Sequence, residues 1–265
     1  MKYETLMVEK SEGIATVTLN RPAKLNALSR QMRMELLDLA LKMREDLDTR
    51  FVIFTGAGRA FSAGADVQEM RETPGETVPA PIRARLGQHL GHDMARALEN
   101  MEQITIAAVN GLALGAGMGV CMACDFRVMS QKAYFGIPEA MVGVFYTWGC
   151  TSRLAHLVGP AWAKDLIMTC RNVDAQEALR IGLAQRVVPP EKLMAEARAL
   201  AKHIGRMPPL VIRLTKKLVN ASAAPQIGDI FLTEPELVER INVSPDRLEA
   251  VNAFLEKREA KYTGL

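Results

Sequence analysis

The chain has 265 residues, of which 49% are hydrophobic and 24% are charged. These proportions are ordinary for a globular protein and suffice for a sizeable core, in one large domain or a core with an appendage. The 33 basic and 30 acidic residues give a net charge of +3, too balanced to indicate a nucleic-acid coat or a polybasic membrane anchor. Residues 1–10 contain no signal-peptide core, so we expect a cytoplasmic protein without membrane association, and nucleic acid is not an expected partner.

The N-terminal segment is predicted to contain two strands, a loop and a helix. Short apolar runs with β-branched residues indicate strands at Leu6–Glu9 and Ile14–Leu19. Residues 20–28 form a loop with basic and apolar members. Ser29 is a favourable N-cap for a helix to about Leu47, because methionines and leucines there recur on one stripe.

The next predicted strand is short and is followed by a glycine-rich loop. Phe51–Phe54 is apolar throughout, which is typical of a buried strand. Residues 56–64 contain three glycines and are predicted to be irregular. Asp66 with Glu69 three residues later matches a capping box, so a helix is predicted to start at Ala65-Asp66.

A proline-rich loop and a long helix follow. Residues 73–81 hold three prolines and are predicted to form a mobile surface loop. Residues 82–101 show a helical pattern. His89 and His92 share one face of this helix, but their polar neighbours indicate a solvated helix and no carboxylate or cysteine partner indicates a metal site.

Residues 104–139 are the most informative stretch. We predict in order a strand, a tight turn, a helix, a strand and a loop that presents one acid: Ile104–Val109, Asn110-Gly111, Leu112–Ala123, Phe126–Met129 and the residues up to Glu139. No charge occurs from Ile104 to Cys124, but glycines and an asparagine interrupt the run, which argues against a membrane span. The glycines could also serve only for close packing.

Cysteine and glycine spacing exclude several kinds of site. Cys121-x-x-Cys124 has no second pair and lies among apolar residues, so we predict a buried helix face rather than half of a zinc site, and no disulfides. Gly115-x-Gly117-x-Gly119 lacks the third glycine of a dinucleotide fingerprint, so a nicotinamide cofactor is not expected.

The C-terminal part is predicted to be helical. Helices are expected at 148–157, 161–168 and 175–181, with a short strand at 185–188. From Lys192 onward the pattern is helical, and prolines mark the expected breaks: Pro208-Pro209, Pro225, Pro235 and Pro245.

Five motifs occur together in one order and spacing. They are Asn-Arg-Pro to Asn-Ala-Leu at 20–28, Phe-Ser-Ala-Gly-Ala-Asp at 61–66, Ala-Val-Asn-Gly with Gly-Ala-Gly at 108–117, Phe-Gly-Ile-Pro-Glu at 135–139, and Phe-Leu-Glu-Lys-Arg at 254–258. Together they resemble the enoyl-CoA hydratase/isomerase (crotonase) superfamily over nearly the whole chain.

The resemblance implies an α/β fold. It consists of a crotonase-like spiral of ββα repeats in residues 1–195, which carries an acyl-CoA site, and a helical trimerisation region in residues 196–265. It also implies a homotrimer or a dimer of trimers. The expected ligand is a coenzyme A thioester as substrate, with no permanently bound cofactor and no metal.

The resemblance also implies which residues form the site. Two backbone N–H groups, of Ala65 and Ala116, would stabilise an enolate at the thioester oxygen, as donors at a helix start can. The remaining residues expected to contact coenzyme A are Ala23, Lys24, Leu25, Ala63, Asp66, Val67, Phe254 and Lys257. From its own sequence context Asp66 is better interpreted as a helix cap, and Lys257 could equally be a solvated lysine.

One departure from the family pattern bears on the reaction. Hydratases of this family hold water with two glutamates, but Gly119 occupies the first of these positions here, and only Glu139 remains. One acid can still carry a proton between two carbons of an enolate, which favours an enoyl-CoA isomerase. Burial against Ile137, Phe145 and Trp148 would raise the pKa of Glu139.

Other activities stay open at the level of sequence. They are an enoyl-CoA hydratase, a hydroxyacyl-CoA lyase, and a non-catalytic relative that binds CoA or RNA. Thr147 stands where dienoyl-CoA isomerases and dehalogenases of the family have an aspartate, which argues against both. Tyr146 and Trp148 could reshape the acyl pocket or fill the core. The methyl group of Ala116, where a glycine is usual, could narrow the site.

Overall fold

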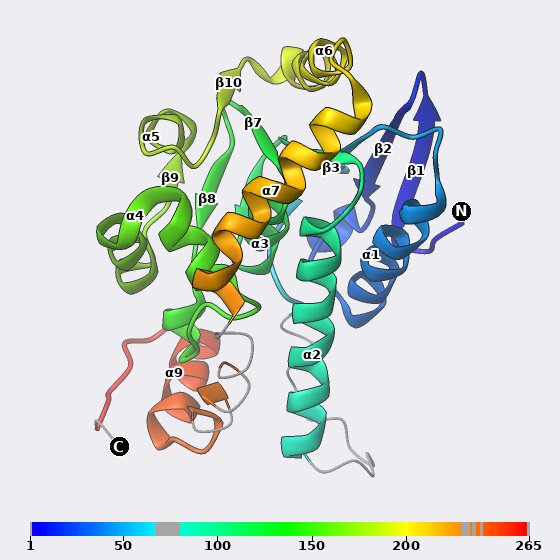
Figure 1. Cartoon of the computed structure of the whole chain (residues 1–265). Coiled ribbons are helices and arrows are strands. Elements are labelled where there is room, and N and C mark those ends of the chain that lie inside the picture. Colours follow the sequence, from blue (N-terminus) through cyan, green and yellow to red (C-terminus); the bar gives the residue numbers. More distant parts are fainter. Residues whose placement is uncertain (1, 67–79, 229–233, 235–236, 239–240, 264–265) are drawn as a thin grey trace.

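Two β-sheets form the body of the computed structural model (Figure 1), which describes residues 2–66, 80–228, 234, 237–238 and 241–263. The larger sheet has six strands in the order β1-β2-β3-β5-β7-β10. Their bounds are Leu6–Ser11, Ile14–Leu19, Phe51–Gly56, Ile104–Val109, Phe126–Ser130 and Arg186–Val188. The smaller sheet has four strands in the order β4-β6-β8-β9, with bounds Ala60–Ser62, Leu112–Leu114, Tyr134–Gly136 and Val173–Asp174.

The chain passes from the larger to the smaller sheet three times, as a spiral requires. β3, β5 and β7 lie side by side and parallel in the larger sheet, and each is followed by a strand of the smaller sheet, β4, β6 or β8. The β1–β2 and β8–β9 pairs are antiparallel. This topology confirms the predicted spiral of strand pairs. The strands β4, β6 and β8 themselves were not predicted, because three residues are too few to show a period.

The helices run as α1, Arg30–Lys42; α2, Ala80–Glu99; α3, Ala116–Ala123; α4, Cys150–Thr169; α5, Ala175–Arg180; α6, Leu193–Ile204; α7, Pro209–Gly228; and α9, Pro245–Glu256. The described part of the chain also contains the 3₁₀ turns η1, Pro22–Lys24; η2, Met43–Glu45; η4, Glu139–Val142; and η5, Pro190–Lys192. In Figure 1, α7 crosses in front of the strands and α9 lies below them, beside the lower end of β8.

Several helix predictions need correction. Ser29 caps α1 as predicted, since its hydroxyl accepts a hydrogen bond from Met32 N at 3.2 Å, but the helix ends at Lys42 and tightens into η2. The two helices predicted around Gly159 are both present within α4, because Gly159 has a non-helical conformation (φ 81°, ψ 159°) that separates them at a kink before Pro160. α7 continues past Pro225 to Gly228, so the helix does not break at this proline as predicted.

Both faces of the larger sheet are buried at β5, which explains why this strand is apolar apart from Thr105. Ile104, Ile106 and Ala108 pack with α6 in one cluster. Ala107 and Val109 belong to the other cluster, which also contains buried residues of α1 and α3. Strands that are covered on both faces read as continuous hydrophobic runs.

The division of the chain between residues 195 and 196 stays a proposal. It falls within α6, whose buried Leu193, Ala197, Leu200 and Ala201 pack against the larger sheet. Within the described residues, no helix is long and apolar enough to cross a membrane.

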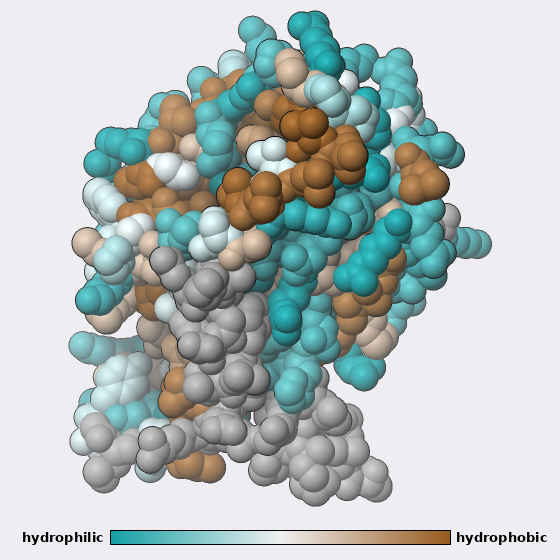
Figure 2. Space-filling view, viewed as in Figure 1, coloured by the Kyte–Doolittle hydropathy of each residue, from teal (hydrophilic) through white to brown (hydrophobic). Residues whose placement is uncertain are grey.

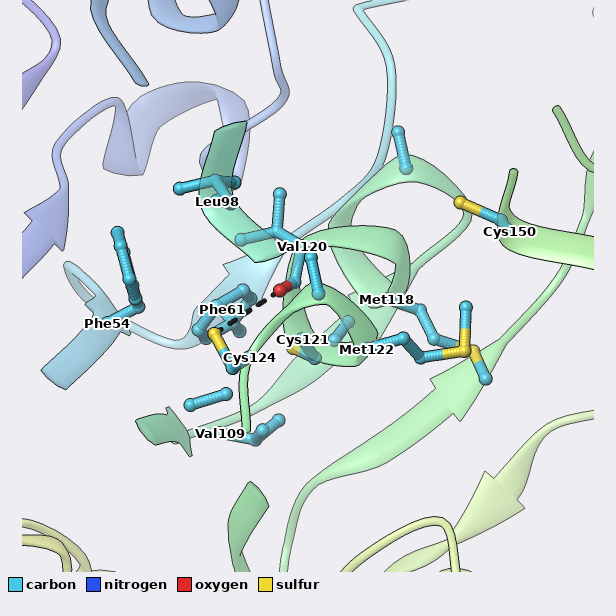
Figure 3. Packing of buried hydrophobic residues seen from close by; sticks show 14 of the residues in the cluster. Phe54, Phe61, Leu98, Val109, Met118, Val120, Cys121, Met122, Cys124 and Cys150 are labelled. Atoms are coloured by element: carbon cyan, nitrogen blue, oxygen red, sulfur yellow. Dashed lines mark hydrogen bonds between the residues drawn. The ribbon is translucent and has the colours of Figure 1, made fainter. Parts of the chain in front are cut away.

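The helix α3 is buried on every side (Figure 3). Cys121 and Cys124 lie in this apolar cluster, so the predicted buried helix face is confirmed. Cys124 Sγ lies 3.4 Å from the carbonyl oxygen of Val120, and burial raises the pKa of this thiol to about 12. Both cysteines are therefore packing residues.

The prediction of a solvated histidine face on α2 is wrong for His92. Its side chain is buried and lies 2.8 Å from Glu234 Oε2, and the same carboxylate accepts a hydrogen bond from Gly149 N at 3.0 Å. Glu234 is 142 residues away in the sequence. His89 is exposed as expected.

Candidate active site

Glu139 lies three residues after the end of β8 and begins the 3₁₀ turn η4. The residue as a whole is half-buried, but its Oε2 is enclosed and has no hydrogen-bond partner among the described residues. Burial raises the pKa of the carboxyl group to about 7 from an ordinary value of 4.5. The direction agrees with the prediction, and a carboxylate with this pKa can both accept and return a proton near neutral pH.

The carboxylate of Glu139 lies against the start of α3. A Cβ atom placed on Gly115 would be 2.2 Å from Glu139 Oε1, so a side chain at this position would displace the acid. Gly115 also has φ 46° and ψ −120°, a conformation that residues with a Cβ avoid. Glycine at 115 is therefore required both by the backbone and by the carboxylate.

The two predicted N–H donors lie on neighbouring backbone segments. Ala116 is the first residue of α3, where amides have no helical acceptor. Gly64, which precedes Ala65, has φ 93°, and a Cβ placed on it would lie 2.9 Å from Leu114 O and 3.7 Å from Ala116 N. Neither the Ala65 nor the Ala116 amide donates a hydrogen bond to another described residue. The fold therefore brings together the segments that carry the two donors.

The loop at Ala23–Leu25 contacts the first of these segments. Ala63 N donates a hydrogen bond to Leu25 O at 2.9 Å, and Leu28 N donates one to Gly64 O at 2.7 Å. Lys24 ends η1, and Leu25 has a left-handed conformation with φ 49°. Of the residues expected to bind coenzyme A, Ala23, Lys24, Leu25 and Ala63 thus lie in one region.

Asp66 forms an ion pair with Arg21, at the start of the same loop. Its Oδ2 is 3.0 Å from Arg21 Nη1, and the carboxylate is 8% exposed. The same arginine nitrogen donates to Ala27 O at 2.6 Å. Val67 and the helix that Asp66 was expected to cap fall in residues 67–79, outside the described residues.

Phe254 and Lys257 lie at the end of α9, and both are exposed. α9 packs against the turn that follows Glu139, where a Cβ on Gly143 would be 3.0 Å from Ala250 Cβ. Among the described hydrogen bonds and ion pairs, none joins Phe254 or Lys257 to the loop at 23–25. Their contact with coenzyme A stays a prediction.

Two side chains lie beside Gly119: Cys150, for which the sequence indicated no function, and Tyr146, which it left open as a pocket or core residue. A Cβ on Gly119 would lie 2.7 Å from Cys150 Sγ and 3.9 Å from Tyr146 Oη. Tyr146 is 1% exposed, and its hydroxyl donates a hydrogen bond to Gly115 O at 2.9 Å. The thiol of Cys150 therefore occupies the space next to Gly119, and the phenol of Tyr146 lies beside it.

Trp148 serves the core rather than an open pocket. Its side chain is buried, and a Cβ on Gly91 of α2 would be 2.2 Å from the indole ring. The ring therefore lies flat against the helix backbone. Of the two functions considered for Tyr146 and Trp148, filling the core is the one that the burial of both side chains supports.

The described part of the chain contains no group of three His, Cys, Asp or Glu side chains that could hold a metal ion. A hollow of about 500 Å³ lies between α4, α7 and β7, and it is lined by residues such as Arg153 and Lys216 but not by Glu139. The acid and the N–H donors that the sequence predicts lie near Gly115 and not in this hollow.

Comparison with known proteins agrees with this geometry. The family model described as Enoyl-CoA hydratase/isomerase matches residues 9–264. The chain belongs to this family. Among curated members, the chain is 39% identical to the short-chain-enoyl-CoA hydratase of Clostridium acetobutylicum over 97% of both chains, and 37% identical to the crotonyl-CoA hydratase of Syntrophomonas wolfei over 99% of both. It is therefore an enzyme of a family that acts on CoA thioesters.

Solved structures of the family share the fold. The enoyl-CoA hydratase/isomerase of Pseudoalteromonas atlantica superposes with a TM-score of 0.87 at 29% identity, over 98% of this chain and all of that chain. A monofunctional enoyl CoA isomerase from M. smegmatis superposes with a TM-score of 0.70 at 32% identity, over 83% of this chain and 93% of that chain. The spiral architecture expected from the sequence is thus confirmed.

Proposed function

We propose that this family member is an enoyl-CoA isomerase that moves a proton with a single carboxylate, that of Glu139. The proposal rests on the side chains that lie next to Gly119. Position 119 carries no carboxylate, and a Cβ placed there would be only 2.7 Å from Cys150 Sγ, with Tyr146 Oη 3.9 Å away. Gripping a water molecule requires a second acid–base group that is absent from this position.

The chemistry follows from the position of each group. The thioester oxygen of a 3-enoyl-CoA would accept hydrogen bonds from the N–H groups of Ala65 and Ala116, which stabilise the charge of an enolate. Glu139 would remove a proton from C2 and return it to C4, so the double bond moves into conjugation and no water is consumed. A pKa of about 7 suits a group that accepts and then donates the proton.

The proposal includes the substrate contacts and the assembly. Ala23, Lys24, Leu25, Ala63, Asp66 and Val67 would line the coenzyme A site, and Phe254 and Lys257 would reach it from α9. The molecule would act as a homotrimer or a dimer of trimers, for which an exposed apolar face on α7 is available (Figure 2).

Hydration is the second candidate. The two curated relatives named above carry the name hydratase, and they resemble this chain over its whole length. In that case the water addition would need a group besides Glu139. A lyase acting on 3-hydroxyacyl-CoA would share the same carboxylate.

A substrate panel separates these activities. The enzyme is offered 3-enoyl-CoA, 2-enoyl-CoA and 3-hydroxyacyl-CoA, together with Glu139→Gln and, as a matched control, Glu191→Gln at an exposed position on η5. We expect isomerisation of 3-enoyl-CoA by the wild type and by E191Q, and a loss of about 10²–10⁴ in rate for E139Q.

Hydration of 2-enoyl-CoA faster than isomerisation would reverse the order of the two candidates. Cleavage of 3-hydroxyacyl-CoA as the main activity would favour the lyase. Full activity in E139Q would exclude Glu139 as the base. Absence of any turnover, with salt-dependent retention on RNA, would favour a non-catalytic relative.

A further inference from the structure

The peptide unit between Gly115 and Ala116 has two functional ends. Its N–H, on Ala116, is one of the two proposed oxyanion donors. Its carbonyl oxygen, on Gly115, points the other way and accepts two hydrogen bonds, from Gly119 N at 3.0 Å and from Tyr146 Oη at 2.9 Å. The first of these bonds is the ordinary helical bond of α3. The second comes from a side chain 31 residues away in the sequence.

We propose that Tyr146 is a positioning residue for the reaction, which acts through the Gly115–Ala116 peptide. Its hydroxyl holds the plane of this peptide and withdraws electron density from the carbonyl, so the Ala116 N–H becomes a stronger donor to the thioester oxygen. Hydrogen bonds in a chain polarise one another, by about 10–30% per bond in condensed phases. The inference rests on the proposed function, because it requires Ala116 N–H to bind the substrate oxygen.

The surroundings of Tyr146 suit this function. The side chain is 1% exposed, so no water competes for the Gly115 carbonyl from its side. Burial raises the pKa of the phenol well above its usual range, so the hydroxyl keeps its proton. The backbone is fastened as well, since Thr151 Oγ1 donates to Tyr146 O at 2.5 Å. The donor is thus buried, protonated and held in place.

Gly119 lies beside this hydroxyl and against Cys150. A Cβ at 119 would lie 3.9 Å from Tyr146 Oη and 2.7 Å from Cys150 Sγ, and a larger side chain would extend into both. The chain therefore has a buried donor behind the oxyanion peptide where hydratases of the family have an acid.

The test uses Tyr146→Phe, which removes only the hydroxyl. Tyr3→Phe is the matched control, because the Tyr3 hydroxyl also donates a hydrogen bond, to Asp38 Oδ2 at 2.9 Å, on the distant α1. The probe is an acyl-CoA with a ¹³C-labelled thioester carbonyl, whose stretching band is measured by difference infrared spectroscopy when it is bound. A lower frequency reports a more polarised carbonyl.

We expect the bound carbonyl band to lie at lower frequency in the wild type and Y3F than in Y146F. Because removing an oxyanion donor outright costs about 10²–10³ in rate, weakening one should cost less, about tenfold in kcat. KM should change little, and the pH profile set by Glu139 should keep its inflection. Site-specific replacement of Tyr146 by 3-fluorotyrosine, a stronger donor with the same ring, should restore or deepen the band shift.

The outcomes distinguish the two proposals. If the wild type shifts the band and Y146F shifts it equally, Tyr146 does not act through the peptide, and the proposed function stands. If the wild type does not shift the band, the oxyanion function of Ala116 fails and the inference fails with it. If Y146F does not fold, the 3-fluorotyrosine variant decides, and an unchanged band there overturns the inference.

Discussion

The carboxylate of Glu139 is buried, and one of its oxygens, Oε2, has no hydrogen-bond partner among the described residues. Burial disfavours the charged form, which raises the pKa to about 7. A buried carboxylate of this kind makes a better base and costs stability once it ionises.

The cost in stability has a definite pH dependence. Between the unfolded pKa of 4.5 and the folded pKa of about 7, the folded protein keeps a proton that the unfolded chain has lost. Stability therefore falls as pH rises through this window, and the loss is complete above it. At about 1.4 kcal/mol per pKa unit, the loss is roughly 3 kcal/mol.

Glu139→Gln should therefore stabilise the protein at pH 8 and not at pH 4. We expect the free energy of unfolding in urea to rise by up to about 3 kcal/mol at pH 8 relative to the wild type. E191Q, at an exposed position, should show no such pH-dependent gain. An equal effect of E139Q at both pH values would contradict the buried-acid account.

The activity should rise with the ionisation of Glu139, whereas the stability falls with it. Because a base must be deprotonated in the free enzyme, kcat/KM for 3-enoyl-CoA should rise with pH and level off, with an inflection near pH 7. Steady-state rates between pH 5 and pH 9 measure this profile. An inflection near the ordinary pKa of a glutamate would show that burial does not tune Glu139.

At the scale of elements, the contact between α3 and α4 sets the shape of the site. Gly119 of α3 faces Cys150, the first residue of α4, at a distance that leaves no room for a methyl group. The turn from Tyr146 to Gly149 leads into α4, and Gly149 has φ 70°. The position of α4 therefore determines where the phenol of Tyr146 lies.

A double-mutant cycle tests this contact. Gly119→Ala should cost about 1–3 kcal/mol of stability, because overpacking a filled core strains it. In a Cys150→Ala background the sulfur atom is gone, so the cost of G119A should be smaller than in the wild type. Urea unfolding of the four proteins gives the coupling energy. Additive effects of G119A and C150A would show that the two positions do not meet.

At the scale of the whole molecule, α7 carries apolar side chains on its surface. Leu210, Val211, Leu214, Leu218 and Val219 are all between 48% and 71% exposed, and Figure 2 shows apolar side chains along the surface where α7 crosses. Contiguous exposed apolar residues on a folded protein mark interaction sites. This face is consistent with the proposed homotrimer or dimer of trimers.

Charges on this face should break the assembly. We expect Leu214→Glu with Leu218→Glu to lower the molar mass measured by light scattering, because two buried carboxylates would oppose subunit contact. Leu47→Glu, at a leucine that is 78% exposed on another part of the molecule, is the matched control and should leave the mass unchanged. A monomeric wild type would contradict the proposed assembly.

The sequence predicts those parts of the fold whose residues are close in the chain. β5 was predicted with its observed bounds, because burial on both faces gives an almost continuous apolar run. β4, β6 and β8 escaped prediction because each has three residues. Tyr146 and His92 could not be assigned, since their partners Gly115 and Glu234 lie 31 and 142 residues away. Glu139 could be assigned from the sequence, because it lies within the Phe-Gly-Ile-Pro-Glu motif at 135–139.

The most direct test follows the proton and the oxygen in one reaction. 3-Enoyl-CoA deuterated at C2 is incubated with the enzyme in H₂¹⁸O, and the products are examined by mass spectrometry and NMR. We predict 2-enoyl-CoA that carries deuterium at C4 and no ¹⁸O, with the reaction slowed by about 10²–10⁴ in Glu139→Gln. A 3-hydroxyacyl-CoA product that contains ¹⁸O, or an undiminished rate in E139Q, would contradict single-carboxylate proton transfer.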